Sequence, residues 1–247
     1  MMLRLRAVLF IALLCAVNAN AQGERDAREA LARGNRAAAH KQYRAALLEY
    51  QKALRSSGEL LAMTRYNIGV CYYHLQQPRE AIREYQAAIS LRNNHYQKAS
   101  YALGIALSEI EDWQAARDAL EDALRLSKGK DAEAAFDLGI VDGRLSDYAS
   151  AAEHFRQAIR HRTGSLSAAH NNLGAMLAMT GRFREAAREF EAAWQLSNAT
   201  SVAARANLNL CRSLTNHSAE NARFIWQVVN TVDEESRIKT KEIIYEH

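Results

Sequence analysis

The sequence predicts an all-α protein built as a continuous array of antiparallel helix pairs. One observation is a glycine that recurs every 35 residues along most of the chain. A second is a set of small and large residues that keep the same spacing from each glycine. A third is the composition, which combines a single proline with many Ala, Leu, Arg and Glu residues and so favours helices. The recurring glycines are Gly34, Gly69, Gly104, Gly139 and Gly174.

Residues 1–21 have the pattern of a secretory signal peptide. Arg4 and Arg6 form a basic start, an apolar run covers residues 7–17, and small residues precede Gln22. The apolar run is shorter than the roughly 20 residues that a membrane-spanning helix needs. We therefore expect cleavage after Ala21, no stable membrane span afterwards, and an exported protein, periplasmic if the source is a Gram-negative bacterium. The alternative is an uncleaved membrane anchor.

Charge and cysteine usage argue against nucleic-acid binding and against a disulfide. Cleavage after Ala21 would remove two arginines and no acidic residue, which lowers the formal net charge from +4 to +2. The remaining basic residues are interleaved with acidic ones instead of forming one stripe. Cys71 and Cys211 occupy equivalent places four repeats apart, and stacked repeats contact only their neighbours. Two buried free thiols are therefore expected.

Residues 22–200 divide into five units of one helix pair each, over residues 27–61, 62–96, 97–131, 132–166 and 167–201. When each unit is numbered so that its glycine is position 8, alanine stands at positions 20 and 27 and a large residue at position 24. In the second unit these are Ala81, Tyr85 and Ala88. A glycine in the first helix and alanines in the second allow close approach of the two backbones, and the large side chain fills the space between them. Pro78 suits the first turn of a second helix.

The pattern weakens from Val202 onward. Asn209 takes the glycine position, and Ala222, Trp226 and Val229 imitate the second-helix pattern with a shift of one residue. Thr231 and Glu234 form a capping-box pattern at the start of a charged last helix, residues 232–246. We interpret residues 202–247 as a degenerate sixth pair followed by a C-terminal capping helix, because the terminal unit of an array must present one face to water.

The repeated pattern of Leu-Gly, then Ala, a large residue and Ala, resembles the tetratricopeptide repeat. The resemblance implies a right-handed superhelical array in which the first helix of each pair lines a concave groove that holds a peptide or helix of a partner protein. Two departures are the 35-residue stride and the absence of a proline at the end of each unit. The lysine and asparagine clamp that some relatives use for a C-terminal carboxylate is not matched, because Leu31, Tyr66 and Tyr101 stand where its first lysine would be.

The resemblance also implies which residues meet a partner, because positions 2, 5, 6, 9, 12 and 13 of such repeats often contact the ligand. In the second unit, positions 2, 5, 9 and 12 also form one helical stripe. The same residues can instead pack between neighbouring units, and the sequence leaves both interpretations open for Tyr66, Val70 and Ile105. The candidate groove residues are Met63, Tyr66, Asn67, Val70, Tyr73, His74, Tyr101, Ile105, Ser108, Phe136, Asp137, Ile140, Arg144, Asn171, Asn172 and Met179.

No motif for catalysis, a cofactor or a metal is recognisable, and the eight scattered histidines are expected to be solvated. The sequence therefore favours a non-enzymatic scaffold or adaptor of the cell envelope, acting in assembly of an envelope, secretion or pilus complex. The alternative is an accessory or glycan-binding module for envelope polysaccharide or cell-wall machinery, with Trp113, Trp194 and tyrosines as stacking surfaces. The oligomeric state is not predicted.

Overall fold

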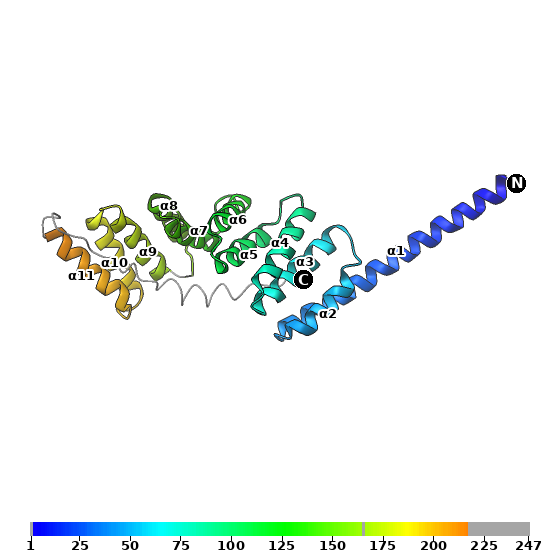
Figure 1. Cartoon of the computed structure of the whole chain (residues 1–247), viewed down its shortest axis with the longest axis horizontal. Coiled ribbons are helices and arrows are strands. Elements are labelled where there is room, and N and C mark those ends of the chain that lie inside the picture. The colour runs from blue at the N-terminus through cyan, green and yellow to red at the C-terminus, as the bar shows by residue number, and fades with distance from the viewer. Residues whose placement is uncertain (1, 165, 217–247) are drawn as a thin grey trace. The chain divides into compact units, whose positions relative to one another are not determined.

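The computed structural model describes residues 2–164 and 166–216, and these ranges contain eleven α-helices and no β-strand (Figure 1). The all-α prediction is confirmed. The helices are α1 (Met2–Ala39), α2 (Tyr43–Ala53), α3 (Gly58–His74), α4 (Pro78–Leu91), α5 (Gln97–Glu109), α6 (Trp113–Leu126), α7 (Ala132–Arg144), α8 (Tyr148–Arg160), α9 (Leu166–Met179), α10 (Phe183–Leu196) and α11 (Val202–Asn216).

The described chain forms two compact units, the first ending at Ala99 and the second beginning at Ser100, inside α5. In the first unit α1 packs on α2, α2 packs on α3, and α3 packs on α4. In the second unit α5 meets α6 where Gly104 faces Leu120. The helices from α6 to α11 then each pack on the next one in the chain. Both units thus repeat the same helix-pair arrangement.

The recurring glycines lie under the large residue of the second helix, as the spacing predicts. A Cβ atom added to Gly69 would lie 2.6 Å from Cε1 of Tyr85, and one added to Gly139 would lie 2.9 Å from Cε1 of Phe155. Both distances are too short for a real contact, so the rings occupy space that any other residue would need. The alanines at positions 20 and 27 are fully buried in all five sequence repeats: Ala46, Ala53, Ala81, Ala88, Ala116, Ala123, Ala151, Ala158, Ala186 and Ala193.

The turns between paired helices have one recurring backbone feature. One residue in each turn has a positive φ angle. In the first four turns the angle lies between 59° and 63°, at Lys41, Gln76, Glu111 and Ser146, and in the fifth turn it is 78°, at Gly181. Only the last of these residues is a glycine, although this conformation favours glycine. Pro78 is the first residue of α4, where its missing N–H leaves no hydrogen bond unmade.

Among the residues whose burial is described, residues 21–26 of α1 are exposed and Ala27 is the first buried one. No helix in the described ranges combines the length and apolar character of a membrane span.

Cys71 and Cys211 are buried free thiols, as expected, and burial raises the pKa of Cys211 to about 11. The proposed capping box at Thr231 and the last helix lie outside the described residues.

Candidate functional site

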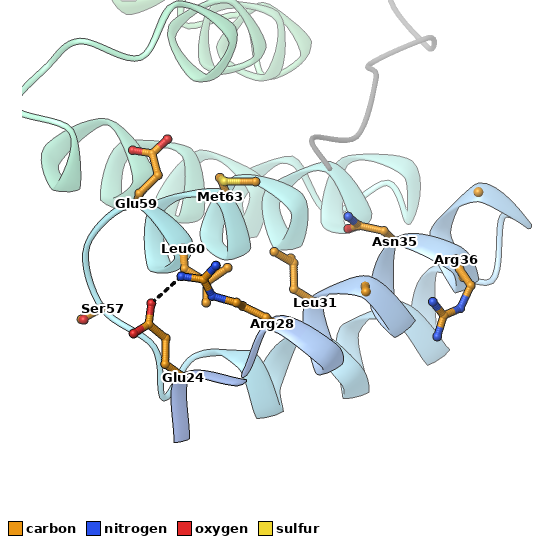
Figure 2. Close-up of a pocket in the computed structure, with 11 residues that line it drawn as sticks. Glu24, Arg28, Leu31, Asn35, Arg36, Ser57, Glu59, Leu60 and Met63 are labelled. Atoms are coloured by element: carbon orange, nitrogen blue, oxygen red, sulfur yellow. Dashed lines mark hydrogen bonds and ion pairs between the residues drawn. The ribbon is translucent and has the colours of Figure 1, made fainter. Parts of the chain in front are cut away.

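A groove of about 600 Å³ lies between α1 and α3 in the first unit (Figure 2). Leu31 on α1 and Leu60 and Met63 on α3 project into the space between the two helices. Leu31 is buried, whereas Leu60 and Met63 are half-buried. The groove therefore has an apolar floor that is open to solvent, and it is lined by Glu24, Arg28, Leu31, Ala32, Asn35, Arg36, Ala39, Ser57, Glu59, Leu60 and Met63.

Charged side chains form the rim of this groove. Arg28 and Glu24 make an exposed ion pair of 2.8 Å at one end. Arg36 is exposed and makes no ion pair among the described residues. Exposed ion pairs contribute little to stability, so these side chains are available to pair with charges on a bound segment.

A hydrogen-bonded amide cluster fixes the polar part of the groove lining. Oδ1 of Asn35 accepts hydrogen bonds of 2.9 Å from the Tyr50 hydroxyl and from Nδ2 of Asn67. All three side chains are buried, and burial raises the pKa of Tyr50. Because α1, α2 and α3 each supply one partner, the cluster holds the walls of the groove at a defined separation.

The structure distributes the predicted groove residues of the first unit between this site and the core. Met63 lines the groove, and His74 is half-buried and stacked on Tyr43, with 4.6 Å between ring centroids. Tyr66 is 2 % exposed and its ring lies 5.8 Å from that of Tyr85 and 5.4 Å from that of Tyr96. The other predicted residues of this unit, Asn67, Val70 and Tyr73, are also buried.

The predicted residues of the second unit divide in the same way. Ile105, Phe136, Asp137, Asn171 and Asn172 are buried. The accessible or half-buried residues are Tyr101, Ser108, Ile140, Arg144 and Met179. Each candidate side chain thus either lines a groove or packs between neighbouring repeats. Burial favours packing for Tyr66, Val70 and Ile105.

Polar groups recur along the first helices of the second unit. Nδ2 of Asn207 on α11 donates to Oδ1 of Asn171 on α9 over 3.2 Å. Nδ2 of the neighbouring Asn172 is buried without a hydrogen-bond acceptor among the described residues. The hydroxyl of Tyr101 on α5 donates to Oδ2 of Asp137 on α7 over 2.6 Å. Burial raises the pKa of Asp137 to about 7, although the Tyr101 hydrogen bond acts in the opposite direction.

The prediction of solvated histidines is wrong for three of the described histidines, the stacked His74 and two that pair with carboxylates. Nδ1 of His154 lies 2.6 Å from Oδ2 of the fully buried Asp142, and Nδ1 of His170 lies 2.7 Å from Oε2 of Glu189. Both pairs join helices, because each carboxylate and its histidine come from different elements. No group of three His, Cys, Asp or Glu side chains in the described ranges is arranged to hold a metal ion.

The two tryptophans proposed as glycan-stacking surfaces are half-buried, and each has an arginine against it. The Arg144 guanidinium lies 5.6 Å from the ring centroid of Trp113, and that of Arg205 lies 5.6 Å from the ring centroid of Trp194. Cation–π contacts of this kind occupy a ring face. The arrangement therefore does not favour glycan stacking.

Comparison with known families identifies the class of protein. Sequence models of the tetratricopeptide repeat match residues 60–129 and residues 136–201, which together span more than half of the chain. The chain belongs to the tetratricopeptide repeat family, and this fold identifies it as a protein–protein interaction scaffold. A search of curated proteins found no match.

Several solved structures share the fold of this chain. YrrB, described as a tetratricopeptide repeat protein with an unusual peptide-binding site, is 22 % identical, with a TM-score of 0.65 over 77 % of this chain and 96 % of its own. A MamA crystal structure is 24 % identical, with a TM-score of 0.62 over 69 % of this chain and 91 % of its own. MamA from Desulfovibrio magneticus RS-1 is 20 % identical, with a TM-score of 0.62 over 71 % and 97 %.

Most residues of the α1–α3 groove were not among the residues predicted from the sequence, because that set began with the second repeat unit, residues 62–96. The signal was nevertheless present in the sequence, because the repeat positions used to choose Met63 and its neighbours also occur in the first repeat unit, residues 27–61. At positions 2, 5, 6, 9 and 13 that unit carries Arg28, Leu31, Ala32, Asn35 and Ala39, and all five line the groove.

Proposed function

We propose that this protein is a non-enzymatic scaffold of the cell envelope that binds a peptide or helix of a partner protein. In the first unit the partner lies in the groove between α1 and α3. In the second unit it lies against the first helices of the pairs. Assembly of an envelope, secretion or pilus complex is the process that such a scaffold would serve.

The observation that supports this proposal is the open apolar floor of the α1–α3 groove. Leu60 and Met63 are half-buried at its floor, beside the buried Leu31. A partner side chain placed there gains about 25 cal/mol for each Å² of apolar surface removed from water. Amphipathic helices and extended peptides both bind grooves of this kind through apolar anchors.

The remaining candidate residues have two roles under this proposal. The residues accessible enough to touch a partner are Met63, His74, Tyr101, Ser108, Ile140, Arg144 and Met179. The buried residues hold the first helices of the pairs in place. They are Tyr66, Asn67, Val70, Tyr73, Ile105, Phe136, Asp137, Asn171 and Asn172.

The groove is tested by filling it without disturbing the core. Ala32 and Ala39 line the groove but are themselves exposed, so Ala32→Glu/Ala39→Glu leaves the buried side chains intact. A peptide selected from a displayed library on the intact protein should bind this variant at least about tenfold more weakly, equivalent to about 1.4 kcal/mol. The matched control is Ala45→Glu, an exposed alanine of α2 outside the groove. Equal binding by all three proteins would refute the groove.

The envelope location is tested separately. Removal of residues 1–21 would take away no residue of the described core, because Ala27 is the first residue that the structure describes as buried. We expect N-terminal sequencing of the protein from its own cells to begin at Gln22 and fractionation to place it outside the cytoplasm. A protein that retains Met1 in the cytoplasm would contradict export while leaving the groove proposal standing.

A further inference from the structure

A second hollow, of about 550 Å³, is formed by the end of α1 and by α2. Ala37 of α1 and Ala45 and Leu48 of α2 give this hollow an apolar centre. Leu48 is 62 % exposed and is the one large apolar side chain of α2 that is mainly exposed. The hollow shares no lining residue with the α1–α3 groove, so it is a separate surface.

A leucine at this place distinguishes the first helix pair from the other four. Leu48 is position 22 of its repeat, and the same position is charged and exposed in the other repeats, where it is held by Arg83, Asp118, Glu153 and Arg188. Helix pairing does not require an apolar residue there, because those four pairs form without one. The apolar centre is therefore a property of this surface and not of the repeat.

The fourth pair shows what covers the equivalent surface inside the array. Its Asp142 and Gln157 hold the positions that Ala37 and Lys52 hold in the first pair. Asp142 lies 3.0 Å from Nε of Arg117 on α6, and Nε2 of Gln157 donates over 2.9 Å to a backbone carbonyl in the turn after α6. The second helix of the preceding pair thus lies against this surface. In the part of the chain that the structure describes, no pair precedes α1 and α2.

Basic side chains border the apolar centre of the hollow. Arg44 and Lys52 stand four residues before and after Leu48, on the same side of α2, and Arg55 follows just after the helix ends. All three cations are exposed. Arg44 and Arg55 make no ion pair among the described residues, whereas Lys52 pairs with Glu49, which also lines the hollow. The border therefore carries an excess of positive charge.

The charge and shape of the hollow favour one kind of occupant. A symmetric dimer would place the same patch of each copy against itself, so like charges would meet. A bilayer surface favours a helix with a broad apolar face, whereas α2 offers one mainly exposed leucine beside a concave space. An acidic amphipathic helix matches both features, because an apolar side chain fills the hollow and carboxylates pair with the cations.

We propose that the hollow beside Leu48 is a second docking surface, which takes an acidic amphipathic helix of a partner protein. That helix lies where the second helix of a preceding pair lies elsewhere in the array. One of its apolar residues packs against Ala37, Ala45 and Leu48, and Asp or Glu residues beside it pair with Arg44, Lys52 and Arg55. The proposal is independent of the α1–α3 groove.

Peptide selection on the intact protein tests this surface. The probe is a displayed library of helical peptides, sorted in the presence of excess soluble Leu48→Glu variant so that only peptides that depend on Leu48 remain. Glutamate is compatible with the fold at this position, because Glu153 holds it in the fourth pair.

The recovered peptides should carry an apolar residue with acidic residues at helical spacing, and they should bind Leu48→Glu at least about tenfold more weakly. Arg188→Glu, the same position in the fifth pair, is the matched control and should bind them as the intact protein does. Recovery of basic peptides, or of no peptide that depends on Leu48, would overturn the proposal.

Neutralising the border tests the role of charge. Lys52→Gln/Arg55→Gln introduces residues that the chain already carries at the same positions, Gln157 and Gln195. The recovered peptides should bind this variant several-fold more weakly, and their affinity should depend less on salt, because fewer charge pairs remain to be screened. Unchanged affinity and salt dependence would refute an acidic partner.

Further variants separate this surface from the groove and from other occupants. Ala45→Glu should weaken the recovered peptides and Ala32→Glu/Ala39→Glu should not, which is the reverse of what peptides in the α1–α3 groove should show. Sedimentation of the protein and its binding to vesicles of phosphatidylcholine and phosphatidylglycerol should both be unchanged by Leu48→Glu. A dimer or vesicle binding that this variant abolishes would assign the surface to a second copy or to lipid, and would overturn the proposal.

Discussion

The second and fourth helix pairs share one backbone pattern and an aromatic interior contact, Tyr66–Tyr85 in one and Phe136–Phe155 in the other, but the fourth pair also encloses a buried carboxylate. In the second pair, Tyr66 is packed against the rings of Tyr85 and Tyr96. In the fourth pair, the fully buried Asp142 lies 3.0 Å from Nε of Arg117 and 2.6 Å from Nδ1 of His154. The glycine and alanine framework thus determines the helix pair, while other interior positions accept apolar or ionic side chains.

The ionic interior gives the largest expected effect. Arg117→Ile leaves Asp142 without its arginine and should lower the free energy of unfolding by about 3–5 kcal/mol, as for other broken buried ion pairs. Arg117→Ile/Asp142→Leu uses residues that this chain already carries at the equivalent positions, Ile82 and Leu107. The double variant should recover most of the loss in urea denaturation. If it is no more stable than the single variant, the ionic cluster is needed for reasons beyond charge pairing.

Asp137 adds a pH dependence that the second pair lacks, since Asn67 holds the same position there. Burial raises its pKa from 3.8 to about 7 in the folded state, and the nearby Glu133 and Asp131 act in the same direction. The folded protein then binds more protons than the unfolded chain between these values, so stability falls as the pH rises from about 4 to about 7.

The loss should be about 1.4 kcal/mol for each unit of pKa difference. Asp137→Asn keeps the side-chain shape and cannot ionise, so its stability relative to the parent should rise across that pH range. Urea midpoints measured at several pH values check this. Parallel curves for the two proteins would show that Asp137 is ionised at no extra cost.

The shared framework gives an intermediate effect. Gly69→Ala places a methyl group 2.6 Å from the Tyr85 ring and should destabilise the protein by about 1–3 kcal/mol through overpacking. The control is Gly143→Ala in α7, where the added Cβ would meet only the flexible end of Met176 at 3.4 Å. Since alanine favours helix, the control should be neutral or up to about 1 kcal/mol more stable. Thermal unfolding of both variants decides whether the glycine is required by packing.

The turns provide the smallest effect and should not distinguish the pairs. Glu111 has a φ of 61°, at the position that Gly181 occupies in the fifth pair. Glu111→Gly should relieve the left-handed strain and stabilise by up to about 1 kcal/mol, partly offset by the flexibility of glycine in the unfolded chain. The melting temperature measures this, and a clear decrease would mean that the Glu111 side chain makes a contribution of its own.

Most of the fold was predictable because its signals are local and repeated. The spacing of Gly69, Ala81, Tyr85 and Ala88 follows from the closeness of two helices, and it recurs in each pair. The candidate site was less predictable. Tyr66 and Met63 share one helical stripe, yet Tyr66 is enclosed by two other rings while Met63 lines a groove. Periodicity assigns both to the same face and does not report what lies against it.

The sequence by itself determined the helix pairs, their register and the family, because close helix packing restricts which side chains fit at fixed intervals. Only the tertiary structure decided where that framework leaves space and where it encloses charge. The groove beside Met63 and the burial of Asp142 both depend on residues from other helices, Leu31 in one case and Arg117 and His154 in the other. Such environments arise from contacts between segments, so no single stretch of sequence contains them.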